Sequence, residues 1–154
     1  MDKAEEAVNC FKGTFNCAQS VFSPFAPEFG LECKIALKIA TPFGGGIAHM
    51  GEVCGAVTGA MMVIGLNDGM SEEEDLEAKE RTYGICQELA SRFKARNGSI
   101  RCRDLIGYDL SNPEEHKKAE EDDVFNTKCT KFVRDAVEIV EELLRKEKAS
   151  GSDP

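Results

Sequence analysis

The chain has 154 residues, of which 42% are hydrophobic and 31% charged, and its formal net charge is −9 at pH 7. This length suits one domain with a buried core, and the composition is ordinary for a soluble globular protein. The acidic balance argues against a nucleic-acid partner, because neutralising phosphates requires clustered lysines and arginines. We expect a single domain over residues 1–148, followed by a disordered tail over residues 149–154.

The N-terminal residues show no basic segment followed by an apolar one, so no secretory signal is predicted. The longest apolar run, residues 53–66, is shorter than the roughly 20 residues that a membrane span needs. We therefore expect a cytoplasmic protein without membrane insertion. Seven cysteines in a reducing compartment do not suit a static disulfide framework, which leaves metal binding, redox chemistry or simple burial.

Helical periodicity recurs along the chain, whereas alternating strand patterns bounded by turns are absent. The predicted helices cover residues 3–12, 14–29, 31–40, 53–66, 71–96 and 122–146. Gly13 should end the first helix, and Pro24 and Pro27 should bend or shorten the second. The apolar stripe of the third helix includes Ile35 and Ile39.

The fifth predicted helix has the clearest end signals. Ser71 with Glu74 reads as a capping box, and the pair Asn97 and Gly98 reads as the C-terminal cap. Its predicted buried stripe includes Leu76, Tyr83, Cys86, Ala90 and Phe93. The stripe of the last helix includes Phe125, Cys129, Phe132, Ala136, Val140 and Leu143. The expected fold class is all-α, a compact bundle of about five to six helices.

Seven glycines fall within residues 44–66, a density that needs an explanation because glycine weakens a helix interior by roughly 1 kcal/mol relative to alanine. One explanation is close helix packing through the small residues of "GAVTGA" at 55–60. The other is that glycines at 44–46 and 51 let backbone amides turn toward Cys54. A phosphate-binding loop is disfavoured, because the lysine of that motif and a preceding strand are both missing. The first two explanations remain open.

The cysteines differ in their local settings. Cys54 stands at the N-terminal edge of a predicted helix, where unpaired amides and the helix dipole lower a thiol pKa. Cys102 lies in the basic loop "IRCRD", and Cys17 and Cys129 lie on apolar helix faces. Three further cysteines have no unusual setting and are interpreted as packing residues: Cys10, Cys33 and Cys86.

His49 precedes Cys54 by five residues and could reach the same site, although a loop histidine satisfied by other contacts is the more frequent case. His116 lies in a charged run and is expected to be solvated. Surplus apolar surface on the fourth helix would make a homodimer possible, and it would be supplied by Met61, Met62 and Ile64.

Four segments carry a resemblance to a known family. They are "NCAQSV" at 16–21, "FGGGIAHMGEVCGAVTGAMMVIG" at 43–65, a cysteine before "DLIG" at 104–107, and a cysteine leading into the last helix. Together they resemble the C-GCAxxG-C-C family, small proteins of anaerobic bacteria and archaea to which redox activity is attributed. The resemblance runs from about residue 7 to residue 140, and the central segment reads CGAxxG here.

The resemblance implies that the four family cysteines are Cys17, Cys54, Cys102 and Cys129. Family members often carry arginine where this chain has His49. The three remaining cysteines lie outside the family pattern, which agrees with a packing role.

The favoured function is a redox or metal-binding site at which these four cysteines converge. Four thiolates suit an iron–sulfur cluster, [2Fe–2S] or [4Fe–4S], or a tetrahedral zinc. An iron–sulfur protein would carry electrons to a redox partner protein, and Arg101 and Arg103 would offset the cluster's charge. The glycines expected to present backbone to the cofactor are Gly44, Gly45, Gly46, Gly51 and Gly55.

Two alternatives stay open beside the metal site. One is a dithiol–disulfide protein without metal, with Cys54 as the low-pKa catalytic thiolate and another of the four as its resolving partner. The other is a structural helical protein whose cysteines are inert and whose acidic faces bind a partner. The sequence leaves open whether the chain is an enzyme.

Overall fold

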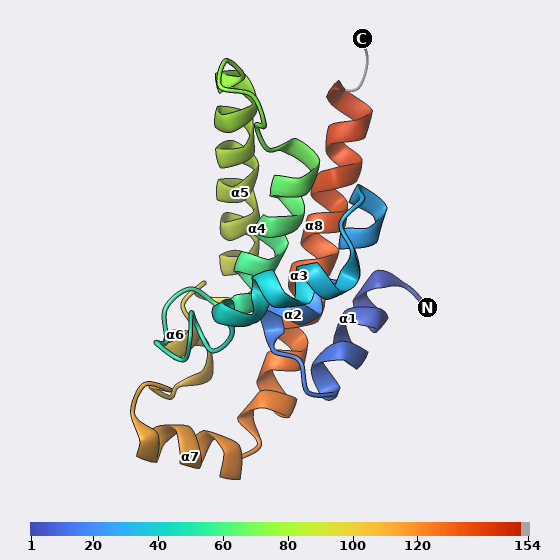
Figure 1. Ribbon diagram of the computed structural model, residues 1–154. Coiled ribbons are helices and arrows are strands. Elements are labelled where there is room, and N and C mark those ends of the chain that lie inside the picture. The colour runs from blue at the N-terminus through green and yellow to red at the C-terminus, as the bar shows by residue number, and fades with distance from the viewer. Residues whose placement is uncertain (152–154) are drawn as a thin grey trace.

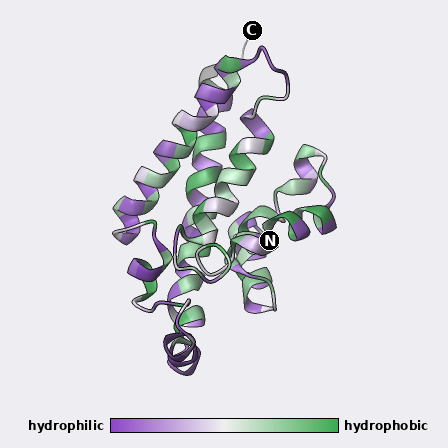
Figure 2. Ribbon diagram, turned by 60° about the vertical axis from the view of Figure 1, so that its left-hand side comes forward, coloured by the Kyte–Doolittle hydropathy of each residue, from purple (hydrophilic) through white to green (hydrophobic). Residues whose placement is uncertain are grey.

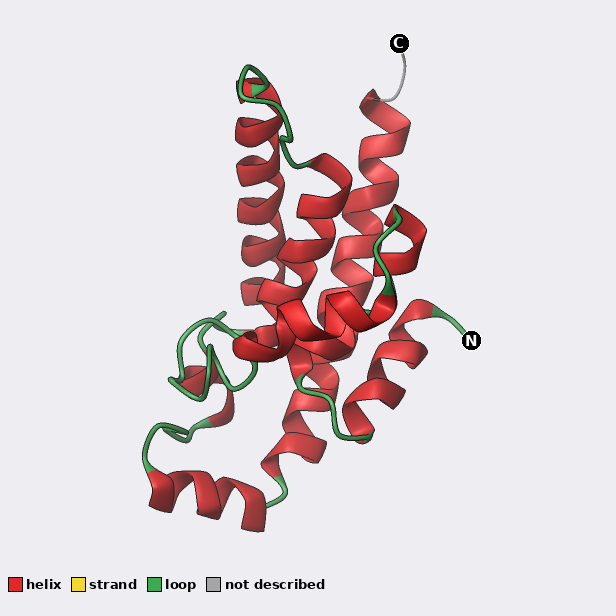
Figure 3. Cartoon of the chain, in the orientation of Figure 1, coloured by secondary structure: helices red, strands yellow, loops and turns green. Residues whose placement is uncertain are grey.

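The computed structural model describes residues 1–151, which form helices, turns and loops without a strand (Figure 3). The predicted all-α class is therefore confirmed. The α-helices are α1 Lys3–Lys12, α2 Cys17–Phe22, α3 Cys33–Ala40, α4 Gly55–Asp68, α5 Leu76–Asn97, α6 Cys102–Ile106, α7 Pro113–Glu121 and α8 Thr130–Gly151. Three short turns of other helical types complete the order: the 3-10 turns η1 Ala26–Phe29 and η2 Thr41–Phe43, and the π-turn η3 Phe125–Cys129.

The expected count of five to six helices was too low, because the segment between α5 and α8 is not a simple loop. It contains α6, which begins at Cys102, and α7, which begins with Pro113 at a position where a missing amide hydrogen costs nothing. Asn112 caps α7 by accepting hydrogen bonds from the amides of Glu114 and Glu115. The two short helices place Cys102 and His116 beside the bundle.

Helices α4, α5 and α8 run side by side as the long axis of the molecule, and α2 crosses them near the middle (Figure 1). Helix α4 lies at the centre, and its fully buried side chains include Val57, Val63 and Ile64. On α8 the predicted inward residues Phe132, Ala136, Val140 and Leu143 are all buried. These apolar faces form one core that extends to α1 and α2.

The second predicted helix is shorter than expected. It begins at Cys17 and ends at Phe22, and Pro24 is followed by the separate turn η1. A proline within the predicted helix lacks the amide hydrogen that a continuing helix needs, which explains the break. The first helix matches its prediction, with Gly13 as its C-terminal cap.

Two of the predicted apolar stripes contain residues that are exposed in the structure. On α3 the buried residues are Ala36 and Ala40, whereas Ile35 and Ile39 are 46% and 47% exposed. On α5 the sequence pattern placed Leu76 and Tyr83 inside, but they are 60% and 52% exposed, whereas Phe93 is buried as predicted and Leu89 is buried as well. Packing against α4 and α8 buries Leu89, a position that the predicted stripe did not include.

Both ends of the long helices differ slightly from the predictions. Helix α5 starts at Leu76, and its cap is Asp75, whose carboxylate accepts from the amide of Ala78 at 3.1 Å, rather than Ser71. Gly98 ends α5 in the left-handed conformation, as predicted. Helix α8 continues to Gly151, so it overlaps the first residues of the predicted tail over 149–154, and residues 152–154 lie outside the described part of the chain.

The helices differ in hydropathy. Helix α7 is almost uniformly hydrophilic and lies at the bottom of Figure 2, and Ala119 is its buried residue. In the described residues 1–151, no helix combines the length and the apolar character needed to cross a membrane. Of the three residues predicted to offer an apolar surface on α4, Met61 and Met62 are partly buried, and Ile64 is fully buried in the core.

Candidate functional site

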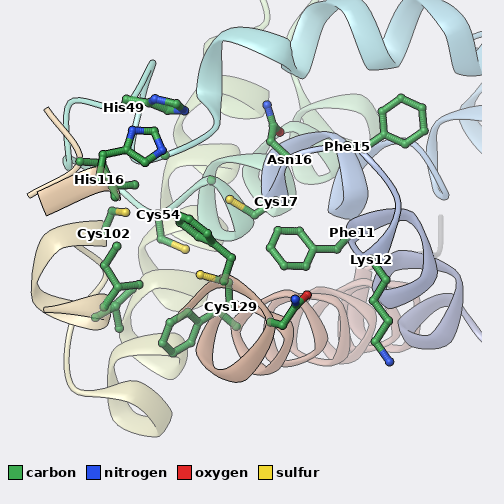
Figure 4. A pocket seen from close by; sticks show the side chains of 18 of the residues that line it. Phe11, Lys12, Phe15, Asn16, Cys17, His49, Cys54, Cys102, His116 and Cys129 are labelled. Carbon is green, nitrogen blue, oxygen red and sulfur yellow. The ribbon is translucent and has the colours of Figure 1, made fainter. Parts of the chain in front are cut away.

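The four cysteines named by the family pattern line one cavity of about 380 Å³ (Figure 4). Cys17 is the first residue of α2, Cys54 precedes α4, Cys102 begins α6, and Cys129 ends η3. All four come from the ends of elements rather than from helix interiors. The remaining cysteines lie outside this lining: Cys10, Cys33 and Cys86.

Backbone pairing between two loops sets Cys54 beside Cys102. The amide of Cys54 donates to the carbonyl of Ile100 at 2.8 Å, and the amide of Cys102 donates to the carbonyl of Glu52 at 2.6 Å. This isolated antiparallel contact joins residues that are about fifty positions apart in the chain. It fixes the starts of α4 and α6 at the same end of the bundle.

The loop before Cys54 contains a left-handed turn over residues 45–49, in which five successive φ angles lie between 48° and 69°. Three of these residues are not glycine, and the left-handed region costs an L-residue roughly 1–2 kcal/mol. The amide of Glu52 donates to the carbonyl of Gly46 at 2.8 Å and closes the turn. The turn also directs the amide of Gly45 toward the sulfur of Cys17.

The glycines of α4 allow its backbone to approach α2. A Cβ atom added at Gly55 would lie 2.6 Å from Sγ of Cys17 and 2.8 Å from the carbonyl oxygen of Phe43, both too short for real contacts. A Cβ at Gly59 would lie 2.8 Å from the carbonyl oxygen of Ala18. The close-packing explanation of these glycines therefore holds, and the packing partner is the segment that carries Cys17.

The five glycines expected at a cofactor fall into two groups. Gly45 and Gly55 line the cavity. The other three press against protein atoms instead: Gly44 on the side chain of Asn16, Gly46 on Cβ of Cys102, and Gly51 on the guanidinium of Arg103. The loop glycines thus let the chain pack tightly around the site. Among these five glycines, Gly45 is the one whose amide faces a sulfur, that of Cys17.

Cys17 carries the low thiol pKa of the site. The thiol of Cys54 donates a hydrogen bond to the Cys17 sulfur, and the amides of Cys17, Ala18 and Gly45 also donate to it. Hydrogen bonds to a thiolate stabilise its charged form, and here they outweigh burial and lower the pKa of Cys17 to about 7. A substantial fraction of Cys17 is therefore thiolate at neutral pH.

The pKa of Cys54 is raised well above its ordinary value, because its proton is held in the hydrogen bond to Cys17 and because the side chain is buried. The prediction of a lowered pKa for Cys54, based on its position at the start of a helix, is therefore wrong. Backbone donation to Cys54 comes from the amide of Ala56, which does not compensate for the two opposing effects. The pair thus shares one proton, with the negative charge on Cys17.

The other two thiols of the cavity remain protonated at neutral pH. Burial raises the pKa of Cys102 to about 12, and the nearby charge of Cys17 acts in the same direction. Burial likewise raises the pKa of Cys129 far above its usual range. Cys129 closes the π-turn that precedes α8, an irregularity often associated with functional sites.

Metal ligation was the favoured expectation for these four cysteines. Within residues 1–151, no group of three or more histidine, cysteine, aspartate or glutamate side chains is placed so that it could hold a metal ion. The thiols share a cavity, but as they stand they do not form a coordination sphere.

The two histidines meet at one end of the cavity. The rings of His49 and His116 have centroids 4.6 Å apart in an edge-on arrangement, and His116 also packs against Phe125. Nε2 of His116 lies 3.2 Å from a carboxylate oxygen of Glu120. His116 was expected to be solvated; it is only 25% exposed, and it also lines the cavity.

Arg101 and Arg103 do not line the cavity. Arg101 pairs with Glu52 at 3.4 Å, and Arg103 donates to the carbonyl of Met50 at 2.9 Å. Both guanidinium groups therefore fasten the glycine-rich loop to α6. If the two arginines offset the charge of a cluster, as expected, they would do so without lining the cavity.

Asn16 and Gln19 support the start of α2, a role that was not predicted from the sequence. The Asn16 side chain accepts from the amide of Gln19, and the Gln19 side chain accepts from the amide of Asn16, each at 2.9 Å. The same two side chains donate to the carbonyls of Thr41 and Leu37, which ties the start of α2 to α3 and η2. The spacing N-x-x-Q is a capping-box signal that could have revealed this support for Cys17.

Comparison with known proteins agrees with this site. Residues 15–143 match the profile of the family described as "Putative redox-active protein (C-GCAxxG-C-C)". An uncharacterized protein of Archaeoglobus fulgidus is 29% identical over 160 residues, which cover 96% of this chain and 99% of the relative. No solved structure matches the chain. The family match spans most of the chain and includes all four cavity cysteines, so the chain belongs to the C-GCAxxG-C-C family.

Proposed function

We propose that the chain is a thiol redox protein whose working pair is Cys17 and Cys54. The observation that carries this proposal is that Cys17 and Cys54 lie together in one cavity (Figure 4), where hydrogen bonding from Cys54 and from backbone amides lowers the pKa of Cys17. A thiolate next to a protonated thiol is the arrangement from which a disulfide forms by exchange.

The redox step converts the dithiol to a disulfide and releases two electrons. The Cys54 thiol gives up its proton in this step, and so does the fraction of Cys17 that is still a thiol. Cys17 is partly exposed to the cavity, whereas Cys54 is 5% exposed, so Cys17 meets an oxidant first and Cys54 acts as the resolving thiol. Return to the dithiol requires a reductant, and a redox partner protein is the expected donor.

A metal or iron–sulfur centre held by all four cysteines is the second candidate. The observation that favours it is the convergence of Cys17, Cys54, Cys102 and Cys129, from four separate segments, on one cavity. Iron–sulfur clusters and zinc both take four thiolate ligands. Binding would require Cys102 and Cys129 to lose protons that burial now retains.

Metal and thiol analysis of protein purified without oxygen separates the two candidates. The dithiol proposal predicts neither iron with sulfide nor zinc at stoichiometric level, and a thiol count that falls by two on mild oxidation. Iron and acid-labile sulfide in near-equal amounts would contradict it in favour of a cluster. Zinc without sulfide, with no oxidisable pair, would contradict it in favour of a zinc site.

Cys54→Ser tests the residue assignment. This variant should lose the two-thiol oxidation while its far-ultraviolet circular dichroism stays close to that of the wild type, because serine is nearly isosteric with cysteine. Cys10→Ser is the matched control, since Cys10 lies outside the cavity and should leave the oxidation intact. Full oxidation of the Cys54→Ser protein would overturn the assignment.

A further inference from the structure

The cavity beside the thiol pair is large enough for a small molecule. Its volume of about 380 Å³ lies within the range of pockets that hold small ligands. The sulfurs lie in its middle, with His49 and His116 at one end and Lys12 at the other (Figure 4). A ligand in this space would therefore lie directly against Cys17.

The walls of the cavity are mainly apolar and aromatic. Phe11, Phe15, Phe125 and Phe132 contribute rings, and Leu105 and Leu110 contribute aliphatic surface. Phe15 is 39% exposed and lies, like Lys12, on the side of the cavity away from the two histidines (Figure 4). Rings around a cavity favour a ligand with a flat or apolar body.

Apart from the Cys17 thiolate, the described lining of the cavity carries no negatively charged side chain. The chain contains 28 aspartates and glutamates, yet none of the described residues that line the cavity is acidic. Lys12 lines it and has no ion-pair partner within residues 1–151. In a protein of net charge −9, a cavity with a free lysine and no carboxylate favours an anionic ligand.

We propose that this cavity binds a low-molecular-mass disulfide with an apolar or aromatic body and an anionic group, and presents it to Cys17. The anion lies toward Lys12, the body lies among the phenylalanines, and the sulfur–sulfur bond lies over Cys17. This inference rests on the proposed dithiol function and adds the substrate class to it.

The reaction is a thiol–disulfide exchange in two steps. The Cys17 thiolate attacks one sulfur of the substrate, forms a mixed disulfide and releases the first half as a thiolate. The Cys54 sulfur then attacks Cys17, gives its proton to the solvent or the leaving group, and releases the second half. The substrate disulfide gains two electrons, and the protein dithiol loses two as the Cys17–Cys54 disulfide forms.

Three synthetic disulfides test the proposal on the reduced, full-length protein. Dithiobis(nitrobenzoate) has aromatic rings with carboxylates, dithiodipyridine has uncharged aromatic rings, and bis(2-hydroxyethyl) disulfide is uncharged and aliphatic. The fast phase with dithiobis(nitrobenzoate) should saturate with its concentration, release two aromatic thiols per chain and leave a Cys17–Cys54 disulfide. The aliphatic disulfide should react without saturation.

Substitutions at Lys12 and Phe11 separate the contributions of charge and ring. Lys12→Gln should slow the reaction with dithiobis(nitrobenzoate) by roughly fivefold, and that with dithiodipyridine by less than about twofold, because an exposed charge contributes modestly. Lys34→Gln removes the same charge from α3, away from the cavity, and should change neither rate. Phe11→Leu should weaken saturation by both aromatic disulfides while preserving the reaction with the aliphatic one.

The outcomes distinguish this inference from the function on which it rests. One outcome would overturn the substrate site alone. In it, the rates with all three probes rise linearly with probe concentration, Lys12→Gln and Phe11→Leu leave these rates unchanged, and the Cys17–Cys54 disulfide still forms. Failure to form that disulfide with any probe would overturn the dithiol function and the substrate site together.

Discussion

Helix α4 contains glycines near both of its ends, and these glycines have different structural roles. Near its start, Gly55 and Gly59 hold the backbone of α4 against α2, where a side chain would collide with Cys17 and Ala18. Near its end, Gly65 has no atom within 4 Å of where its Cβ would be. Glycine is therefore a packing requirement at the thiol end and a replaceable residue at the other.

The regions around these ends differ in the same way. The far end is a regular helix bundle in which Arg81 of α5 pairs with Asp68 of α4. The thiol end depends on a left-handed turn, two paired loops and short helices around a cavity. The strained backbone at residues 45–49 therefore lies at the thiol end, where the cysteines meet.

The largest expected effect concerns the thiol pair itself. Cys54→Ala removes the thiol that donates to Cys17, so the pKa of Cys17 should rise from about 7 toward its ordinary value. We expect alkylation of Cys17 at pH 7 to slow by at least about tenfold, because only the thiolate reacts. Iodoacetamide labelling followed by peptide mass spectrometry measures this rate, with the pH profile of the wild type for comparison.

In the wild type, labelling of Cys17 should rise with pH through a midpoint near 7. The Cys86→Ala variant is the control, since Cys86 lies outside the cavity and its loss should leave the midpoint in place. An unchanged rate of Cys17 alkylation in Cys54→Ala would show that Cys54 does not lower the pKa of Cys17.

The glycine comparison predicts opposite signs for one kind of substitution. Gly55→Ala should lower the free energy of unfolding by about 1–3 kcal/mol, because the added methyl group meets Sγ of Cys17 and the backbone of Phe43. Gly65→Ala should raise it by about 0.5–1 kcal/mol, since alanine favours the helix and the space is open. Urea unfolding under reducing conditions measures both changes. Equal effects at the two positions would contradict the different roles of Gly55 and Gly65.

The left-handed turn offers a test of strain. Ala48 has φ of 48° and an exposed side chain, so Ala48→Gly should raise the free energy of unfolding by about 1 kcal/mol. Ala90→Gly, in the regular helix α5, should lower it by a similar amount. Thermal or urea unfolding of the two variants gives the comparison, and destabilisation by Ala48→Gly would argue against strain at this turn.

The smallest expected effect lies at the far end, where Glu147 of α8 faces Asp68 of α4, with Asn67 and Arg81 beside them. Burial and the hydrogen bond with Asp68 raise the pKa of Glu147 to about 7. The folded state therefore holds this proton more tightly than the unfolded chain does. Its contribution to stability is present at low pH and is lost as pH rises toward and through about 7.

Glu147→Gln should flatten this part of the stability profile without altering thiol reactivity. Glu121→Gln, on the exposed end of α7, is the control for a change of net charge. Chemical unfolding between pH 5 and pH 8 is the measurement, and an identical slope in the wild type and Glu147→Gln would contradict the assignment of the proton.

Much of the fold was predictable from local signals, and the site was predictable mainly through the family resemblance. Gly13 and Gly98 mark helix ends as predicted, and the inward residues of α8 follow the helical period. The convergence of thiols could not be derived from spacing, because Cys54 and Cys102 meet through loop pairing. The preference for a thiolate on Cys17 depends on the Gly45 amide and the Cys54 thiol, which only the tertiary structure brings together.

The most direct test of the central claim is to identify which cysteines become linked when the reduced, metal-free protein is oxidised in a thiol–disulfide buffer. Peptide mass spectrometry after alkylation of the remaining thiols assigns the bond. The account predicts a Cys17–Cys54 disulfide as the first product, with Cys102 and Cys129 still reduced. A first disulfide that excludes Cys17, or no intramolecular disulfide at any buffer potential, would contradict it.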